Sequence, residues 1–225
     1  MSFKAGSSRT TIRVALAAAA LFALSSTTLS GTASAAVEAG RDYAPLHQPQ
    51  KPEVPANQTE VIEFFSFACP HCYEFNRQLL AWAGKLPAHV TFRQVPVGFD
   101  KPGWVPLARA AYAIQATGDF ARLETPLFDA IHKERLPLFD EQSITAWMVK
   151  HGVDGAKFTA AYNSFGVNTR MAQNQRTVIG YEVALVPALV VDGRYNVLGR
   201  TFEEMLTHAS ALIDKARAER AGKKS

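Results

Sequence analysis

The sequence predicts an α/β domain that is interrupted by a helical insertion. A strand, helix and strand pattern runs over residues 59–100, and the apolar residues of 101–184 recur at helical spacing. A strand pattern with a final helix then returns over 185–225. The segment 101–184 is much longer than the single crossover helix that joins two parallel strands, so we expect it to form an inserted helical subdomain.

Residues 1–35 have the pattern of a secretory signal peptide. The segment holds three basic residues and no acidic one, and its apolar run at 14–24 is too short to span a bilayer. Ala33 and Ala35 form a small-residue cleavage signature. We therefore expect cleavage after Ala35 and export of the remaining chain. The alternative is an N-terminal membrane anchor, which the length of the run disfavours.

The charge balance changes once residues 1–35 are set aside. The remaining chain has 21 basic and 20 acidic residues, and five of the basic ones lie beyond residue 214. This balance gives no indication of a nucleic-acid partner. The segment 36–58 contains four prolines and no helical period, so we expect an extended N-terminal segment that lies over the domain.

Residues 59–100 give the first half of the α/β pattern. The run VIEFFSFA at 61–68 is almost continuously apolar, which is typical of a central strand covered on both faces. Helical spacing begins near Pro70, and proline suits the first helical position because its missing N–H is not needed there. The segment HVTFRQVPVGF alternates and indicates a second strand ending near Pro96.

The second half of the pattern follows the insertion, within which we expect five helices. Asp192 and Gly193 lie between two short apolar runs and predict a two-residue hairpin turn. Residues 201–222 then form an amphipathic helix, with Thr201 as the expected N-cap and Glu204 completing a capping box.

Cys69 and Cys72 are the two cysteines of the chain, and two residues separate them. A disulfide across so short a loop restrains the unfolded chain little, so a structural staple is disfavoured. A structural zinc site needs four ligands, and the histidines outside this motif show no ligand spacing, so no metal is expected. We expect these histidines to be surface residues: His47, His89, His132, His151 and His208.

A Cys-x-x-Cys pair at the turn from a strand to a helix is the arrangement of redox proteins. Helical positions i and i+3 lie about 5–6 Å apart, which a disulfide can span. Cys69 would lie at the helix N-terminus, where unpaired N–H groups and the helix dipole stabilise a thiolate. Cys69 is therefore the expected nucleophile, and Cys72, one turn later, is the expected resolving thiol.

His71 lies between the cysteines and is expected to stabilise the Cys69 thiolate by its charge or by an N–H hydrogen bond. A stabilised thiolate is a good leaving group, so such a pair tends to give its disulfide away. The alternative is an exposed loop histidine without a catalytic role.

Three segments resemble the DsbA family: SFACPHCYEF at 66–75, the VIEFF strand before it, and LVPALVVDGRYNV at 185–197. That family consists of bacterial periplasmic thiol:disulfide oxidases, and the likeness covers essentially the whole chain after residue 35. It implies a thioredoxin fold with an inserted helical subdomain, in which the thioredoxin-like domain comprises 59–100 and 185–225.

The resemblance also implies roles for single residues. Pro187 would form a cis peptide bond and face the cysteines, and the Val186 backbone would lie where an extended substrate can pair with it. Glu63, which interrupts an apolar strand, would be a buried acid that helps to move the proton of Cys72. Burial would raise its pKa towards a useful range. The alternative for Glu63 is a solvent-facing strand position.

The partners follow from the same resemblance. They are newly exported cysteine-containing proteins and the quinone-linked membrane protein DsbB, which would reoxidise a monomer in the periplasm without a cofactor. One alternative is a reductase or isomerase, but isomerases of this fold are dimers built on an N-terminal domain for which 36–58 is too short. Another is a non-enzymatic binding or chaperone module.

Overall fold

The structure is a computed structural model that describes residues 1–3 and 36–222. The predicted signal peptide at 1–35 lies almost entirely outside the described residues and stays a prediction. Residues 36–222 belong to one compact unit. Among the helices of the described residues, none combines the length and the apolar composition needed to cross a membrane.

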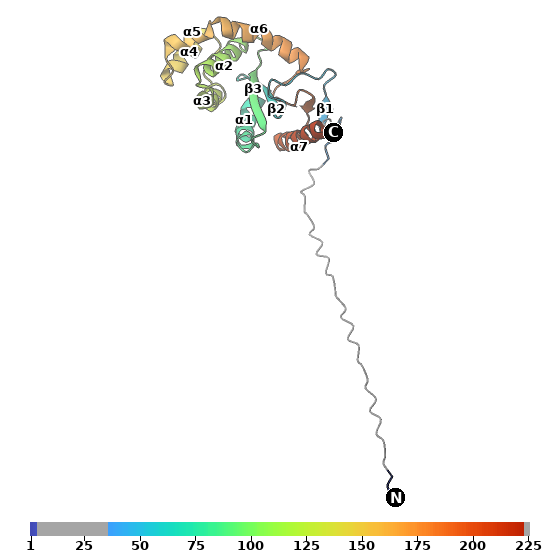
Figure 1. Cartoon of the computed structure of the whole chain (residues 1–225). Coiled ribbons are helices and arrows are strands. Elements are labelled where there is room, and N and C mark those ends of the chain that lie inside the picture. The colour runs from blue at the N-terminus through green and yellow to red at the C-terminus, as the bar shows by residue number, and fades with distance from the viewer. Residues whose placement is uncertain (4–35, 223–225) are drawn as a thin grey trace. The chain divides into compact units, whose positions relative to one another are not determined.

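A mixed sheet in the order β1-β5-β4-β2-β3 forms the centre of this unit (Figure 1). β2 lies inside the sheet, parallel to β3 and antiparallel to β4. All of its residues are buried, which agrees with its nearly unbroken apolar run. The strands are β1 (Tyr43–Pro45), β2 (Thr59–Phe65), β3 (Val90–Pro96), β4 (Ala188–Val191) and β5 (Tyr195–Val197).

The N-terminal segment 36–58 contributes a strand that the sequence did not predict. Within it, β1 pairs antiparallel with β5 at the edge of the sheet, so the segment is more than an extended cover. Three residues are too few to show an alternating pattern, and Pro45 at the end of β1 disfavours a strand prediction. An edge strand tolerates this proline because one side of its backbone needs no partner strand.

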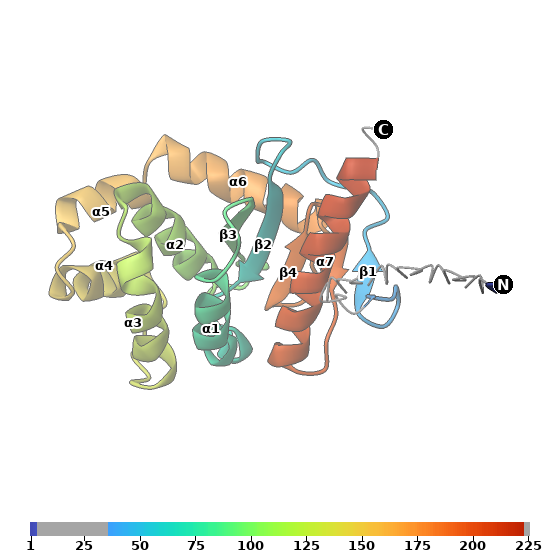
Figure 2. The same ribbon diagram turned by 60° about the horizontal axis from the view of Figure 1, so that its bottom comes forward.

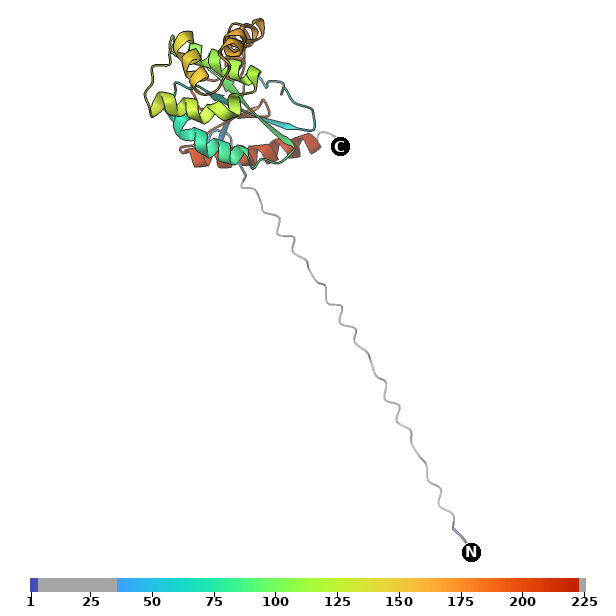
Figure 3. The same ribbon diagram turned by 90° about the vertical axis from the view of Figure 1, so that its left-hand side faces the viewer.

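Two helices, α1 (Pro70–Ala83) and α7 (Phe202–Gly222), lie side by side over one face of the sheet (Figures 2 and 3). Val61 of β2 packs there with Leu79 of α1 and Leu212 of α7. Each of these side chains is fully buried. This layer attaches α1, and with it both cysteines, firmly to the sheet.

The opposite face of β2 packs against a different cluster. Ile62 and Phe64 lie there against Tyr181, the residue that follows the long helix α6. Successive residues of a strand point to opposite faces, so Glu63 shares the face of Val61, under α1. The side chain of Glu63 therefore lies in the layer between the sheet and α1, and not in the layer that contains Tyr181.

Five helices lie between β3 and β4, inside the predicted insertion 101–184. The apolar side chains of the first four form one cluster with Phe65, Phe67 and Cys72, so these four helices cover the carboxyl end of β2 and the start of α1. Aspartate or serine side chains cap the last three of the five. The helices are α2 (Val105–Thr117), α3 (Phe120–His132), α4 (Glu141–Lys150), α5 (Gly155–Tyr162) and α6 (Phe165–Gly180). The division into two domains stays a prediction.

The predicted hairpin turn joins β4 to β5. Asp192 and Gly193 both have positive φ, at 56° and 62°. Positive φ at two successive turn positions matches the twist of the flanking strands and favours Asp-Gly. Val191 pairs with Tyr195, so the loop has three residues and not the predicted two. The carbonyl of Gly193 accepts a hydrogen bond from the Gln50 N–H at 2.7 Å, so the N-terminal segment packs directly on this turn.

The capping box predicted for α7 is half correct. The Thr201 hydroxyl oxygen accepts the N–H of Glu204 at 3.1 Å, as an N-cap should. The Glu204 carboxylate, however, accepts the N–H of Arg200 at 2.8 Å instead of the N–H of Thr201. It also pairs with the Arg200 guanidinium, so the carboxylate contacts the residue before the N-cap and not the N-cap itself.

Candidate active site

The two cysteines lie where the sequence predicts, at the N-terminus of α1. Cys69 is the N-cap residue in an extended conformation, and Pro70 is the first helical residue. Both cysteines are free thiols. Cys69 is 4% exposed and Cys72 is fully buried, so a reacting partner would meet Cys69 first.

The surroundings separate the pKa values of the two thiols. The Cys72 thiol, which hydrogen-bonds to Cys69, lowers the pKa of Cys69 to about 6, against the effect of burial. The backbone N–H groups of Cys72 and His71 add to this effect. Burial raises the pKa of Cys72 strongly, and the hydrogen bond to Cys69 and the charge of Glu63 act in the same direction. One thiol therefore favours the thiolate form while the other holds its proton.

His71 lies on the outer side of the helix N-terminus. Its side chain is 73% exposed, and its Nδ1 lies 3.3 Å from Glu74 Oε2. Its charge lowers the pKa of Cys69, but less than its own backbone N–H does. The backbone of this position therefore contributes more to the Cys69 thiolate than the ring does.

The loop before β4 brings Val186 and Pro187 to the cysteines. The peptide bond between these two residues is cis, as the family resemblance implies. The Cys69 Sγ–H donates to the Val186 carbonyl oxygen at 3.4 Å, across a separation of 117 residues. The backbone predicted to bind substrate thus lies in direct contact with the expected nucleophile.

Glu63 is buried on β2 under α1. It is 2% exposed, so the alternative of a solvent-facing position is wrong. Burial raises its pKa to about 8, against the hydrogen bond that its Oε2 accepts from Gln94 Nε2 at 2.8 Å. The charge of Glu63 in turn contributes to the raised pKa of Cys72, after burial and the hydrogen bond to Cys69.

The sequence did not single out α3 as part of the site. His132 Nε2 donates to the Phe67 carbonyl oxygen at 2.7 Å, and its ring stacks on Tyr73 with 5.0 Å between the ring centroids. The Tyr73 hydroxyl donates to Asp129 Oδ1 at 3.0 Å. The prediction that His132 is a surface residue is wrong, since this half-buried side chain holds the loop that leads to Cys69. A lone histidine in a helix carries no sequence signal for such a contact.

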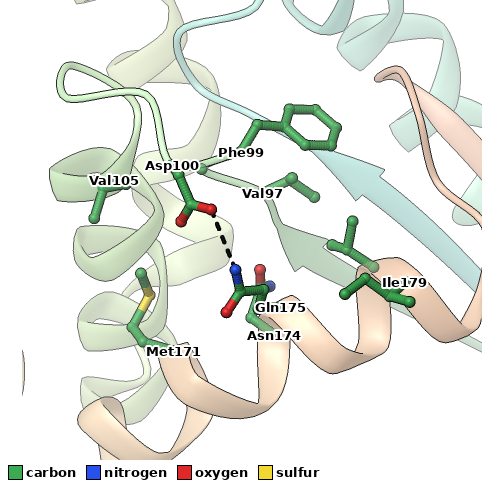
Figure 4. A pocket seen from close by; sticks show the side chains of 10 residues that line it. Val97, Phe99, Asp100, Val105, Met171, Asn174, Gln175 and Ile179 are labelled. Carbon is green, nitrogen blue, oxygen red and sulfur yellow. Dashed lines mark hydrogen bonds between the residues drawn. The ribbon is translucent and has the colours of Figure 1, made fainter.

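A pocket of about 300 Å³ lies between the segment after β3 and helix α6 (Figure 4). Asp100 and Gln175 approach each other across it, with the Gln175 Nε2 donating to Asp100 Oδ2 at 3.2 Å. Val97 and Val178 from its lining belong to the hydrophobic cluster on which Val186 packs. The pocket thus shares a hydrophobic cluster with Val186, but none of the predicted site residues lines it.

Comparison with known proteins agrees with this geometry. Residues 60–211 match the family described as the DSBA-like thioredoxin domain. The chain belongs to this DsbA-like family. The thiol:disulfide interchange protein DsbA of Burkholderia cepacia is 34% identical over 186 residues, which cover 83% of this chain and 87% of that protein. The namesake from Azotobacter vinelandii is 35% identical over 206 residues, covering 90% and 95%.

Solved structures of DsbA proteins show the same fold. The crystal structure of Pseudomonas aeruginosa DsbA superimposes with a TM-score of 0.77 at 32% identity, covering 84% of this chain and 97% of that one. The oxidoreductase DsbA from Xylella fastidiosa gives 0.76 at 31% identity, covering 81% and 98%. The thioredoxin fold with a helical insertion is confirmed. The chain is a thiol:disulfide oxidoreductase of this DsbA-like family, and the two thiols at the start of α1 suit that chemistry.

Proposed function

We propose that this protein donates a Cys69–Cys72 disulfide to cysteine-containing proteins through a mixed disulfide at Cys69. One observation carries the proposal: the structure lowers the pKa of Cys69 to about 6 and raises that of Cys72. A disulfide is a strong oxidant when its reduced form is stabilised, and a Cys69 thiolate stabilises the reduced form.

The reaction begins when a substrate thiolate attacks Cys69 Sγ. A substrate–Cys69 bond forms, the Cys69–Cys72 bond breaks, and its electron pair passes to Cys72 Sγ. Cys72 then takes a proton, and we assign Glu63 as the donor because it is buried beside Cys72 and its pKa is raised to about 8. A second substrate thiolate attacks the substrate sulfur of the mixed disulfide and expels Cys69 as a thiolate. The substrate is oxidised by two electrons and the protein is reduced.

The Val186 backbone is the proposed site for the substrate chain. Its carbonyl oxygen already accepts the Cys69 thiol proton, so a peptide that binds along Val186 and Pro187 brings its own cysteine to Cys69 Sγ. Backbone hydrogen bonds give affinity without selecting particular side chains. Such binding suits an oxidase that must accept many substrates.

The cellular setting is part of the same proposal. We assign residues 1–35 to a cleaved signal peptide, the mature protein to the periplasm, and reoxidation to the membrane protein DsbB. The protein would act as a monomer without a cofactor. The relatives are named thiol:disulfide interchange proteins, which supports the reaction class but identifies neither partner.

The reduction potential in glutathione buffers tests the direction of transfer. A strongly oxidising value is expected, because thiolate stabilisation favours the reduced form. A strongly reducing value would indicate a reductase or isomerase, and no exchange at all would indicate a binding or chaperone module. Alkylation of the reduced protein at pH 6 gives an independent check, with Cys69 expected to react and Cys72 to stay protected. A Cys72→Ala variant should trap substrate and reoxidising partner as mixed disulfides at Cys69.

The His71→Ala variant tests the ring of His71 separately from its backbone. The variant keeps the backbone N–H near Cys69 and loses only the charge, so the reduction potential should fall modestly. Each tenfold change in the exchange constant corresponds to roughly 30 mV. An unchanged potential would leave His71 as an exposed histidine whose backbone alone contributes.

A further inference from the structure

A second buried acid lies beside Glu63, on a helix of the insertion. Gln94 of β3 donates one hydrogen bond to Glu63 Oε2 at 2.8 Å and another to Glu124 Oε1 of α3 at 2.6 Å. Both bonds come from the same amide nitrogen, Nε2. Three elements thus converge on one polar cluster beneath the cysteines: β2, β3 and α3.

This carboxyl pair has no cation. Glu63 is 2% exposed and Glu124 is 2% exposed, and within residues 36–222 neither forms a salt bridge. The groups that act on them are Gln94 from β3 and, for Glu63, Glu124 and Cys69, the residue before α1. Arg93 lies next to Gln94 in the chain but points to the opposite face, where it pairs with Glu60.

One amide cannot support two buried negative charges. Gln94 supplies a single N–H to each carboxyl, and two carboxylates that share a site without a cation do not both ionise readily. The structure agrees: burial raises the pKa of Glu124 to about 7, and the charge of Glu124 adds to the rise of the Glu63 pKa to about 8. Around neutral pH the charge therefore falls mainly on Glu124 and the proton on Glu63.

We propose that Glu124 is a positioning residue that, through its charge and the shared Gln94 amide, keeps on Glu63 the proton that Cys72 takes during disulfide donation. This inference rests on the proposed function. The proton moves from the Glu63 carboxyl to the Cys72 thiolate as the Cys69–Cys72 bond breaks. During reoxidation the Cys72 thiol returns it to Glu63 as Cys72 becomes a nucleophile. Glu124 touches neither sulfur and acts only through Glu63.

The pH dependence of peptide oxidation tests this role. The oxidised protein is mixed with a short cysteine peptide, and the second-order rate constant is divided by the thiolate fraction of the peptide. In the wild-type protein this corrected constant should be flat at low pH and fall with a midpoint near pH 8, where Glu63 loses its proton. In Glu124→Gln the midpoint should move down by about one pH unit, because the neighbouring charge is gone.

Two further variants separate positioning from a structural effect. Glu124→Asp keeps the charge and should retain most of the wild-type midpoint. Glu63→Gln should show a lower constant without the falling limb, and adding Glu124→Gln to it should change the profile no further. A Glu124→Gln profile that coincides with the wild type, or an equal effect of this change in the Glu63→Gln background, would overturn the proposal.

The outcomes also separate this inference from the proposed function. If the wild-type protein fails to oxidise the peptide, the function itself is wrong; if it oxidises the peptide and only the Glu124 effect is absent, the function stands. If Glu124→Gln does not fold, the carboxyl ¹³C signals of the wild-type protein answer the same question. Two coupled titration steps support the proposal, and two independent ones contradict it.

Discussion

β2 carries two buried glutamates on opposite faces, and the protein holds them in opposite ways. Glu60 is fully buried, and its Oε1 receives the Arg93 Nε at 2.8 Å. Glu63 is three residues further along and receives only the neutral amide of Gln94. Adjacent residues of β3 thus supply a cation to one face and an amide to the other.

The difference separates an ion-paired acid from the acid that we propose as a proton donor. A buried carboxyl group that pairs with a guanidinium forms an ion pair that holds two strands together. A buried carboxyl beside an amide keeps its proton near neutral pH, as the raised pKa of Glu63 indicates. Only the second kind can serve Cys72, and it lies on the face that α1 covers.

Breaking the ion pair should have the largest effect on stability. Arg93→Met leaves Glu60 buried without its cation, so we expect the free energy of unfolding to fall by about 4 kcal/mol in urea melts at pH 7. The double variant with Glu60→Gln should recover much of this loss, because no buried charge stays unpaired. An equal loss in both variants would mean that Arg93 stabilises mainly through the packing of its side-chain methylenes.

Neutralising Glu63 should raise the free energy of unfolding, whereas breaking the ion pair lowers it. Its pKa rises from about 4.5 in the unfolded chain to about 8 in the folded protein. The folded state therefore binds more protons, and wild-type stability falls as the pH rises through this window. Glu63→Gln removes that loss, so the reduced variant should exceed the reduced wild type by on the order of 3 kcal/mol at pH 9 and match it near pH 4.

The matched control for Glu63→Gln is Glu60→Gln on the same strand. It removes the partner of Arg93 and should destabilise the protein at pH 9. If both glutamine variants shift stability in the same direction at pH 9, the contrast between the two faces is wrong.

Removing the side-chain amide of Gln94 should have the smallest effect on stability. Gln94→Met takes the hydrogen-bond donor away from both Glu63 and Glu124, and donors matter more to a charged carboxylate than to a neutral acid. We expect the variant to lose about 1 kcal/mol more at pH 9 than at pH 5. Denaturant melts at the two pH values measure this difference, and an equal loss at both would show that Gln94 contributes packing alone.

Much of the fold follows from local pattern. The apolar run at 61–68 indicates a central strand, Asp192 and Gly193 indicate a hairpin, and both are present in the structure. β1 was not predicted, because its stability comes from pairing with β5, about 150 residues later, and not from its own three residues. Strands held mainly by distant partners carry little signal in their own sequence.

In the site too, features set by local spacing could be predicted, whereas features set by distant contacts could not. The spacing of Cys69 and Cys72 predicts their adjacency, since a single helical turn sets it. Glu124 gave no signal, because a glutamate in the amphipathic helix α3 is expected to face solvent. Glu124 is buried in the structure, and its hydrogen-bond donor Gln94 is 30 residues away. Roles that come from contacts between elements require the assembled structure.

The contacts of α3 with the cysteine loop limit how far this chemistry can be moved to another protein. His132 holds the Phe67 carbonyl just before Cys69, and Asp129 holds the Tyr73 hydroxyl just after Cys72. Grafting CPHC onto a thioredoxin fold without the insertion would leave that carbonyl and that hydroxyl without these partners. Transfer of this thiol chemistry to another protein therefore requires α3 together with the motif. A homologue with a shortened insertion would lose the same contacts around its own cysteines.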